Sequence, residues 1–131
     1  QKFKRSFNEL KNIVTMTETV FREQGLDPGL RNVVDLATEE LFVNMVTYNT
    51  ESSEDILIEM KPHAVGLEVS LTDFDVERFD PTRAADVDVD APLSERTPGG
   101  LGLYLVLKMV DSIHYKYRDR QSTITFIVDR K

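Results

Sequence analysis

Two polar side chains on a predicted helix have the chemistry of a base and of a metal ligand. Glu40 and Asn44 lie in the segment 28–48, whose apolar residues recur at helical spacing. Both fall on the broad apolar face, on the side of Val33 and Ala37, one helical turn apart. A carboxylate and an amide are costly there unless they have partners. Either they protrude at a helix end or are satisfied by backbone, or Asn44 offers an oxygen to a hard cation such as Mg²⁺ while Glu40 acts as a base on a hydroxyl or water.

A third polar residue ends a predicted strand. Apolar and other residues alternate along 65–72, and Asp73 continues the apolar row. A carboxylate therefore ends the row that faces the core. It is either a turn residue at the strand end or an acceptor for a ligand N–H at the bottom of a pocket.

A glycine cluster precedes an apolar segment of helical length. Three of the six glycines lie within the four residues 99–102, and the apolar segment continues to Val110. Glycine lets the backbone approach a ligand closely, and a helix start presents unpaired N–H groups and a positive dipole end. The cluster is either a phosphate site or a turn that only starts a helix.

Composition narrows the classes of protein and of site. The 131 residues predict one domain, 1–131, and the absence of cysteine excludes disulfides and thiolate zinc sites. A net charge of −7 disfavours direct binding of nucleic acid. No apolar run approaches the length of a membrane span, so we expect no membrane association and a cytoplasmic location.

The elements that must position these residues follow from periodicity. Predicted helices occupy 8–24, 28–48 and 101–111. Predicted strands occupy 2–7, 56–60, 65–72, 113–117 and 124–128, with a turn at 61–63, a long loop at 74–98 and a terminal hairpin. This pattern predicts an α+β fold, a two-layer α/β sandwich with helices on one face of a mixed, mostly antiparallel sheet.

The order of the polar residues resembles a known family. Glu40-x-x-x-Asn44 on a helix, Asp73 at a strand end and Gly99-Gly100-Leu101-Gly102-Leu103 at a helix start resemble the ATP-binding domain, the Bergerat fold, shared by histidine kinases, DNA gyrase and heat-shock chaperones. More narrowly, the chain looks like the bacterial anti-sigma-factor serine/threonine kinases. The likeness covers almost the whole chain.

The resemblance implies roles for the matching polar residues. Asn44 would coordinate the Mg²⁺ that bridges the ATP phosphates, and Glu40 would be the general base for a protein hydroxyl. Asp73 would accept a hydrogen bond from the adenine amino group. Asp75 stands where the family usually has a glycine beside the nucleotide, and aspartate is among the residues that tolerate a left-handed conformation best.

The resemblance also assigns the remaining nucleotide contacts. The loop 75–98 would cover the nucleotide, and Thr123 would lie near the adenine. The phosphates would be held at the helix start by Gly99, Gly100, Leu101, Gly102 and Leu103.

The implied function is an ATP-dependent serine/threonine protein kinase that acts as an anti-sigma regulatory factor. Such a protein binds a sigma factor and phosphorylates an anti-anti-sigma protein of the STAS type, and family members commonly form homodimers. Asp75 favours an alternative, a catalytically weak or inactive protein-binding module of the same fold that sequesters its partner. A third interpretation is an ATP-hydrolysing or histidine-phosphorylating domain of a larger machine.

Overall fold

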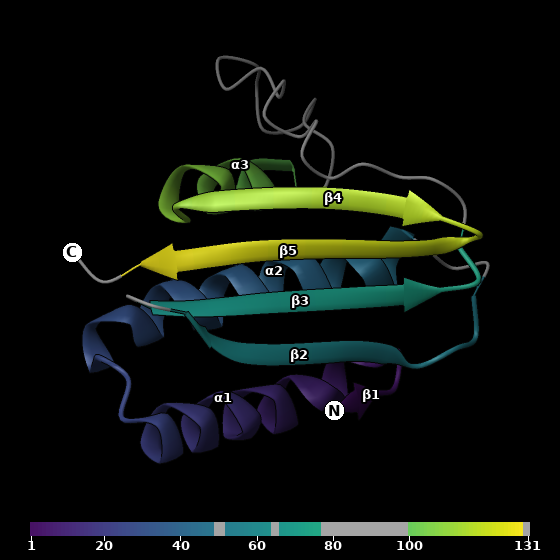
Figure 1. Ribbon diagram of the computed structural model, residues 1–131. Helices are drawn as coiled ribbons and strands as arrows, with labels where there is room; N and C mark the ends of the chain where they lie inside the picture. The colour runs from purple at the N-terminus through teal and green to yellow at the C-terminus, as the bar shows by residue number, and fades with distance from the viewer. Residues whose placement is uncertain (49–51, 64–65, 77–99, 130–131) are drawn as a thin grey trace.

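One five-stranded sheet organises the molecule (Figure 1). The computed structural model describes residues 1–48, 52–63, 66–76 and 100–129. The strands are β1 (Lys2–Phe3), β2 (Ile56–His63), β3 (Gly66–Phe74), β4 (Ser112–Arg118) and β5 (Gln121–Asp129). Their order across the sheet is β1-β2-β3-β5-β4, and each of these neighbouring pairs is antiparallel. The expectation of a mixed sheet is thus corrected for the described strands.

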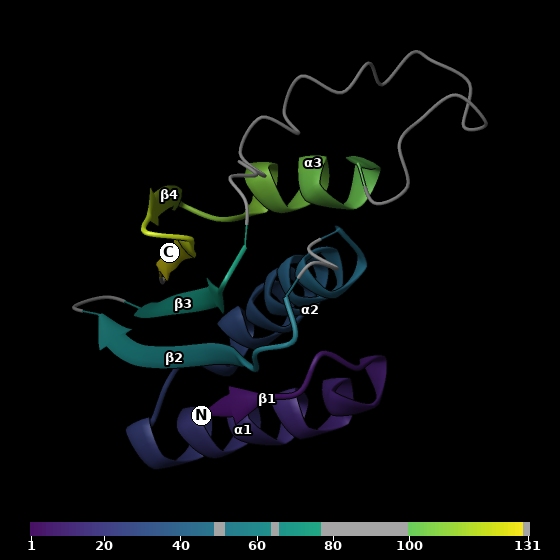
Figure 2. The same cartoon turned by 90° about the vertical axis from the view of Figure 1, so that its right-hand side faces the viewer.

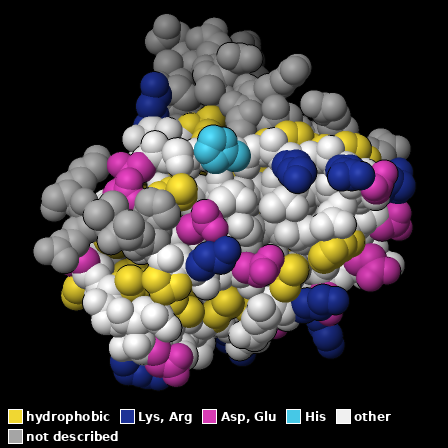
Figure 3. All heavy atoms as spheres, viewed as in Figure 1, with side chains coloured by type: hydrophobic (Ala, Val, Ile, Leu, Met, Phe, Trp, Pro, Cys, Tyr) yellow, Lys and Arg dark blue, Asp and Glu magenta, His cyan; other side chains and the backbone are white. Residues whose placement is uncertain are grey.

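Three helices cover one face of the sheet (Figure 2). They are α1 (Leu10–Gln24), α2 (Arg31–Tyr48) and α3 (Gly100–Met109), and α2 packs against both of the others. The predicted two-layer α+β sandwich is confirmed. The other face, here called the open face, is covered by none of the described helices and carries a mixture of acidic, basic and hydrophobic side chains (Figure 3).

Local signals in the sequence set the ends of the first two helices. Gly25 ends α1 in the left-handed conformation, with φ of 61°, which glycine adopts without a steric penalty. Asp27 then accepts a hydrogen bond from the Gly29 N–H at 2.9 Å. This cap starts a short 3₁₀ turn, η2 (Pro28–Leu30), that leads into α2. A similar turn, η1 (Phe7–Glu9), precedes α1.

The strand bounds differ from the prediction, and β1 and β2 show the physical reason. The first strand was expected at 2–7, but β1 ends at Phe3, and β2 continues through 61–63, where we expected a turn. The register shows why Pro62 is tolerated in a strand. In the part of the chain that the structure describes, β1 pairs with β2 only at Ile56 and Leu57, so the outer edge of β2 at Pro62 has no strand beside it.

The hydrophobic core lies between the sheet and the helix layer. Its largest fully buried side chains from the helices and strands are Phe3, Phe42, Phe126, Leu41, Ile56, Ile58, Leu67, Leu71, Val34, Val69 and Val106. The inward-facing residues of β3 and β5 meet directly across the pair, as Leu71 opposite Ile124 shows. This alternation decides which polar side chains at the end of β3 point into the molecule.

Candidate functional site

Glu40 and Asn44 are neighbours on α2, as their spacing predicted. The Asn44 Nδ2 donates to the Glu40 main-chain oxygen at 2.7 Å and to the Glu40 carboxylate oxygen Oε2 at 3.3 Å. Asn44 is buried and Glu40 is half-buried. Burial raises the pKa of the Glu40 carboxyl, the charge of Glu39 raises it further, and the hydrogen bond from Asn44 lowers it. A carboxyl whose pKa is raised toward neutrality is a stronger base when ionised.

The amide of Asn44 has the chemistry to bind a cation. Its nitrogen donates to Glu40, and its oxygen is the atom that could bind a hard metal ion. Magnesium in proteins commonly takes one or two side-chain oxygens and fills its other positions with phosphate oxygens and water. A single amide oxygen beside a phosphate-bearing ligand therefore fits Mg²⁺. Among the described residues, no group of three His, Cys, Asp or Glu side chains forms a metal site independent of a ligand.

The start of α3 supplies the predicted phosphate-binding segment in part. The helix begins at Gly100, and Leu101, Gly102 and Leu103 form its first turn, for which only the backbone is described. The prediction of a helix that opens at the glycine cluster is confirmed. Gly99 and residues 77–98 of the predicted covering loop 75–98 lie outside the described residues.

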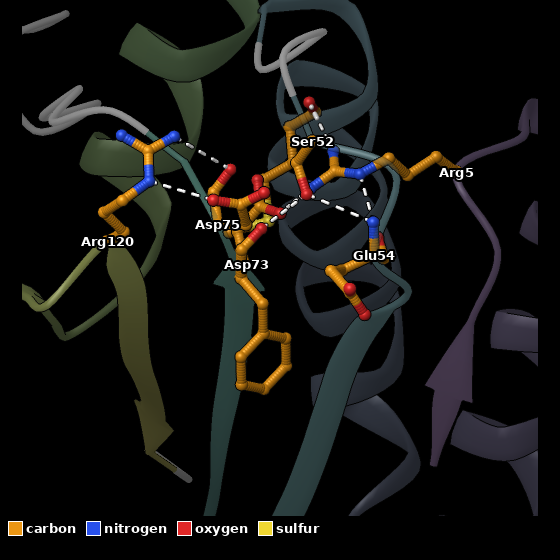
Figure 4. Close-up of polar contacts among 8 residues, drawn as sticks. Arg5, Ser52, Glu54, Asp73, Asp75 and Arg120 are labelled. Atoms are coloured by element: carbon orange, nitrogen blue, oxygen red, sulfur yellow. Dashed lines mark hydrogen bonds and ion pairs between the residues drawn. The ribbon is translucent and has the colours of Figure 1, made fainter.

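Asp73 lies on the core side of the sheet at the end of β3, as the alternation predicted. Its side chain has no exposed surface, and it is opposite Ser122 of β5. The Arg5 guanidinium forms an ion pair with it through Nη2 (Figure 4). Sequence reasoning missed Arg5, because the pair joins residues 68 positions apart (73 − 5 = 68) and nothing in the local sequence marks that contact.

Arg5 connects three segments at the end of β3, the corner formed by Asp73 and Asp75. Besides Asp73, it donates from Nε to the main-chain oxygen of Glu54 at 2.9 Å and from Nη1 to that of Met45 at 3.2 Å. Each nitrogen of the guanidinium thus has a partner, one on β3, one at the end of α2 and one before β2. Only 12% of the Arg5 side chain is exposed, so the ion pair with Asp73 is largely shielded from water.

Asp75 adopts the conformation that a glycine would favour. Its φ is 56°, in the left-handed region, where aspartate is among the better tolerated residues. Its carboxylate accepts from Arg120 Nε at 2.9 Å, and the Val76 N–H donates to the Arg120 main-chain oxygen at 2.9 Å. The chain therefore keeps the unusual turn without glycine, and Arg120 determines where the added carboxylate points (Figure 4).

Thr123 lies on the opposite face of the sheet from Asp73. It is opposite Thr72 in the register, and the two hydroxyl oxygens are 3.3 Å apart. Since side chains alternate along a strand, the residue of β5 that shares the Asp73 side is Ser122, which is buried. The structure therefore does not bring Thr123 to Asp73, and it identifies Ser122 as the nearby hydroxyl that sequence analysis missed. The signal was available, because Ser122 has the parity of the buried Ile124 and Phe126.

The described helices also bear on membrane association. None of them combines the length and the apolar character that crossing a bilayer requires.

Comparisons with known proteins identify the fold and the family of the chain. Residues 3–128 match the sequence profile of the histidine kinase-like ATPase domain. A search of curated proteins finds no significant match. Among solved structures, the Acinetobacter baumannii histidine kinase AdeS superposes with a TM-score of 0.55 at 13% identity, over 98% of this chain and 66% of that one. At that identity the likeness shows the fold alone, and this chain spans about two thirds of the kinase chain. The profile match covers nearly the whole sequence, so the chain belongs to the histidine kinase-like ATPase domain family, which implies ATP binding.

Proposed function

We propose that this domain binds Mg·ATP between α2 and the start of α3 and phosphorylates a serine or threonine hydroxyl of a partner protein. The observation that carries the proposal is the Glu40–Asn44 pair, which combines a half-buried carboxylate with a buried amide one turn away. Both the profile match and the order of motifs along the chain support a nucleotide as the ligand. In this site Mg²⁺ would neutralise phosphate charge.

Glu40 is the residue that would handle the proton. During transfer the hydroxyl oxygen bonds to the γ-phosphorus, the bond from that phosphorus to the β–γ bridging oxygen breaks, and Glu40 takes the hydroxyl proton. Its raised pKa, caused mainly by burial, makes it a better proton acceptor than an exposed glutamate. The N–H groups at the start of α3 would bind phosphate oxygens.

The adenine end of the site would lie at the corner made by Asp73 and Asp75. Asp73 presents its carboxylate to the core side, and Asp75 follows in a left-handed turn with its own carboxylate bonded to Arg120. We propose that the partners are a sigma factor and an anti-anti-sigma protein of the STAS type, as in the anti-sigma-factor kinases that the motifs resemble. A homodimer is part of the same proposal.

A second candidate function has a specific observation in its favour. Asp73 is already paired with Arg5 and has no exposed surface, so the carboxylate proposed to bind adenine is inaccessible to a ligand in this structure. A protein-binding module of the same fold, without catalysis, would not need access to this carboxylate. Calorimetry with Mg·ATP separates the two functions, because the module would give no binding heat at millimolar nucleotide.

The test of catalysis compares two neighbouring glutamates. Glu40→Ala should leave Mg·ATP binding within a few-fold and lower phosphoryl transfer to a purified STAS-domain protein by roughly 10²–10⁴, the usual contribution of a general base. Glu39→Ala is the control, because Glu39 is exposed on the same helix: it removes one of the charges that raise the pKa of Glu40 but leaves the Glu40 carboxylate in place, so most of the transfer should remain. Since the pKa of Glu40 is raised, the rate should fall with decreasing pH at a higher pH than for an exposed glutamate. Unchanged transfer in Glu40→Ala would remove Glu40 from the reaction.

A further inference from the structure

Asp73 is closed off from ligands in this structure. An ionised aspartate is an acceptor only, and the amino group of adenine is a donor that it would recognise. The Asp73 side chain has no exposed surface, so a ligand reaches it only after a neighbouring group moves.

Arg5 is the neighbour that is chemically equivalent to the ligand. Its Nη2 makes a charge-assisted contact with Asp73 Oδ1, and an adenine amino group would donate to the same carboxylate. The guanidinium also carries a full positive charge, so it weakens the attraction of Asp73 for any further donor. Arg5 and an adenine amino group are therefore alternative partners for one acceptor.

The segment that carries Arg5 is attached at the edge of the sheet. β1 contains two residues, Lys2 and Phe3, and the Gln1 main-chain oxygen accepts from the Ile58 N–H at 2.9 Å. Arg5 follows β1 and precedes the first helical turn, so regular secondary structure does not fix its backbone. Short edge strands open at lower free energy than central strands. The N-terminal segment that carries Arg5 is therefore the neighbour of Asp73 that can move away at low cost.

We propose that Arg5 competes with the adenine amino group for Asp73 and thereby sets both the affinity and the base selectivity of the nucleotide site. This inference rests on the proposed function. ATP binding requires Arg5 to leave Asp73, so the apparent affinity is the intrinsic affinity multiplied by the fraction of molecules in which the pair is open. Guanine carries an acceptor oxygen where adenine carries the amino group, so GTP gains nothing when Arg5 withdraws.

The experiment measures Mg·ATP and Mg·GTP binding by calorimetry in three variants. Arg5→Gln should bind ATP about tenfold more tightly than the natural chain, with GTP unchanged, so the ATP/GTP ratio rises. Arg5→Lys keeps the charge, but an ammonium group lacks the planar guanidinium that reaches three acceptors. Its affinity for ATP should therefore lie between those of the natural chain and Arg5→Gln. Arg31→Gln is the matched control, because Arg31 also joins a carboxylate, Asp35, and a main-chain oxygen, that of Val14.

A measurement on the natural chain covers the case in which Arg5→Gln fails to fold. The Arg5 Nε–H donates to the Glu54 oxygen, and its nitrogen resonance is identified by its loss in Arg5→Lys. ATP should shift that resonance and speed its hydrogen exchange, GTP should not, and the Arg31 Nε–H bonded to Asp35 should stay unchanged.

The outcomes separate this inference from the proposed function. If the natural chain binds ATP, but the Arg5 variants bind it equally or more weakly and the Arg5 resonance does not respond, Arg5 is no competitor and the inference is overturned alone. If neither the natural chain nor any folded variant binds ATP, the proposed function is overturned and this inference with it.

Discussion

Two arginine–aspartate pairs hold the same end of β3, and they differ in burial, in origin and in backbone conformation. Arg5 comes from the N-terminal segment and meets Asp73, which is fully buried, whereas Arg120 comes from the β4–β5 turn and meets Asp75 with both side chains more than half exposed. Asp73 lies in a regular strand, and Asp75 has a left-handed backbone. The two pairs have the same chemistry but should contribute differently to stability, because water competes with the exposed Arg120–Asp75 pair and is largely kept from the Arg5–Asp73 pair.

The largest expected effect comes from breaking the buried pair on one side. Arg5→Met should destabilise the domain by about 3–5 kcal/mol, because it leaves the Asp73 carboxylate buried without its cation. Urea denaturation measures this loss. The double variant Arg5→Met/Asp73→Leu should recover much of it, since apolar side chains replace both charges. A loss below about 1 kcal/mol in the single variant would show that the pair is solvated and that the contrast between the two pairs is absent.

A smaller effect is expected from the backbone at the exposed pair. Asp75→Val should lower the free energy of unfolding by about 1–2 kcal/mol, because a β-branched residue is strained in the left-handed conformation, with φ of 56°, that Asp75 adopts. Asp75→Gly is the control, because it removes the same carboxylate without strain, and it should stay closer to the natural chain in urea denaturation. Equal losses in both variants would assign the stability to the carboxylate rather than to the turn.

The smallest effect is expected from the exposed ion pair itself. Arg120→Gln should change the free energy of unfolding by about 0–1 kcal/mol, because the pair with Asp75 is open to solvent. Raising the salt concentration should reduce the difference further, as screening predicts. A loss above about 2 kcal/mol that persists in high salt would place Arg120 alongside Arg5 and remove the contrast.

The layers of the fold were predictable because each depends on short-range patterns. Alternation along β3 and β5 and helical spacing in α2 each need only a few consecutive residues, and they placed Glu40 beside Asn44 and Asp73 on the core side. The extension of β2 through Pro62 was not predictable in this way. A proline usually signals a turn, and its tolerance here depends on how short β1 is.

The candidate site was predictable only where a pattern fixed the direction of a side chain. Thr123 was assigned by resemblance, although the parity of its own strand points it to the open face and points Ser122 inward. Arg5 had no such pattern, because one arginine in a polar N-terminal segment gives no signal of a partner on β3. Long-range ion pairs depend on how elements far apart in sequence come together, which local periodicity does not encode.

The distribution of these arginines along the chain has a consequence for biosynthesis. Arg5 is synthesised well before Arg120 and β5, yet both arginines reach the same end of β3. A nascent chain that stops before Gln121 would leave β3 with β2 as its sole described neighbour, and one that stops before Arg120 would also leave Asp75 without its cation. The corner is therefore completed only after β5 has been synthesised, so nucleotide would bind chains that contain β5 in preference to chains that stop before it.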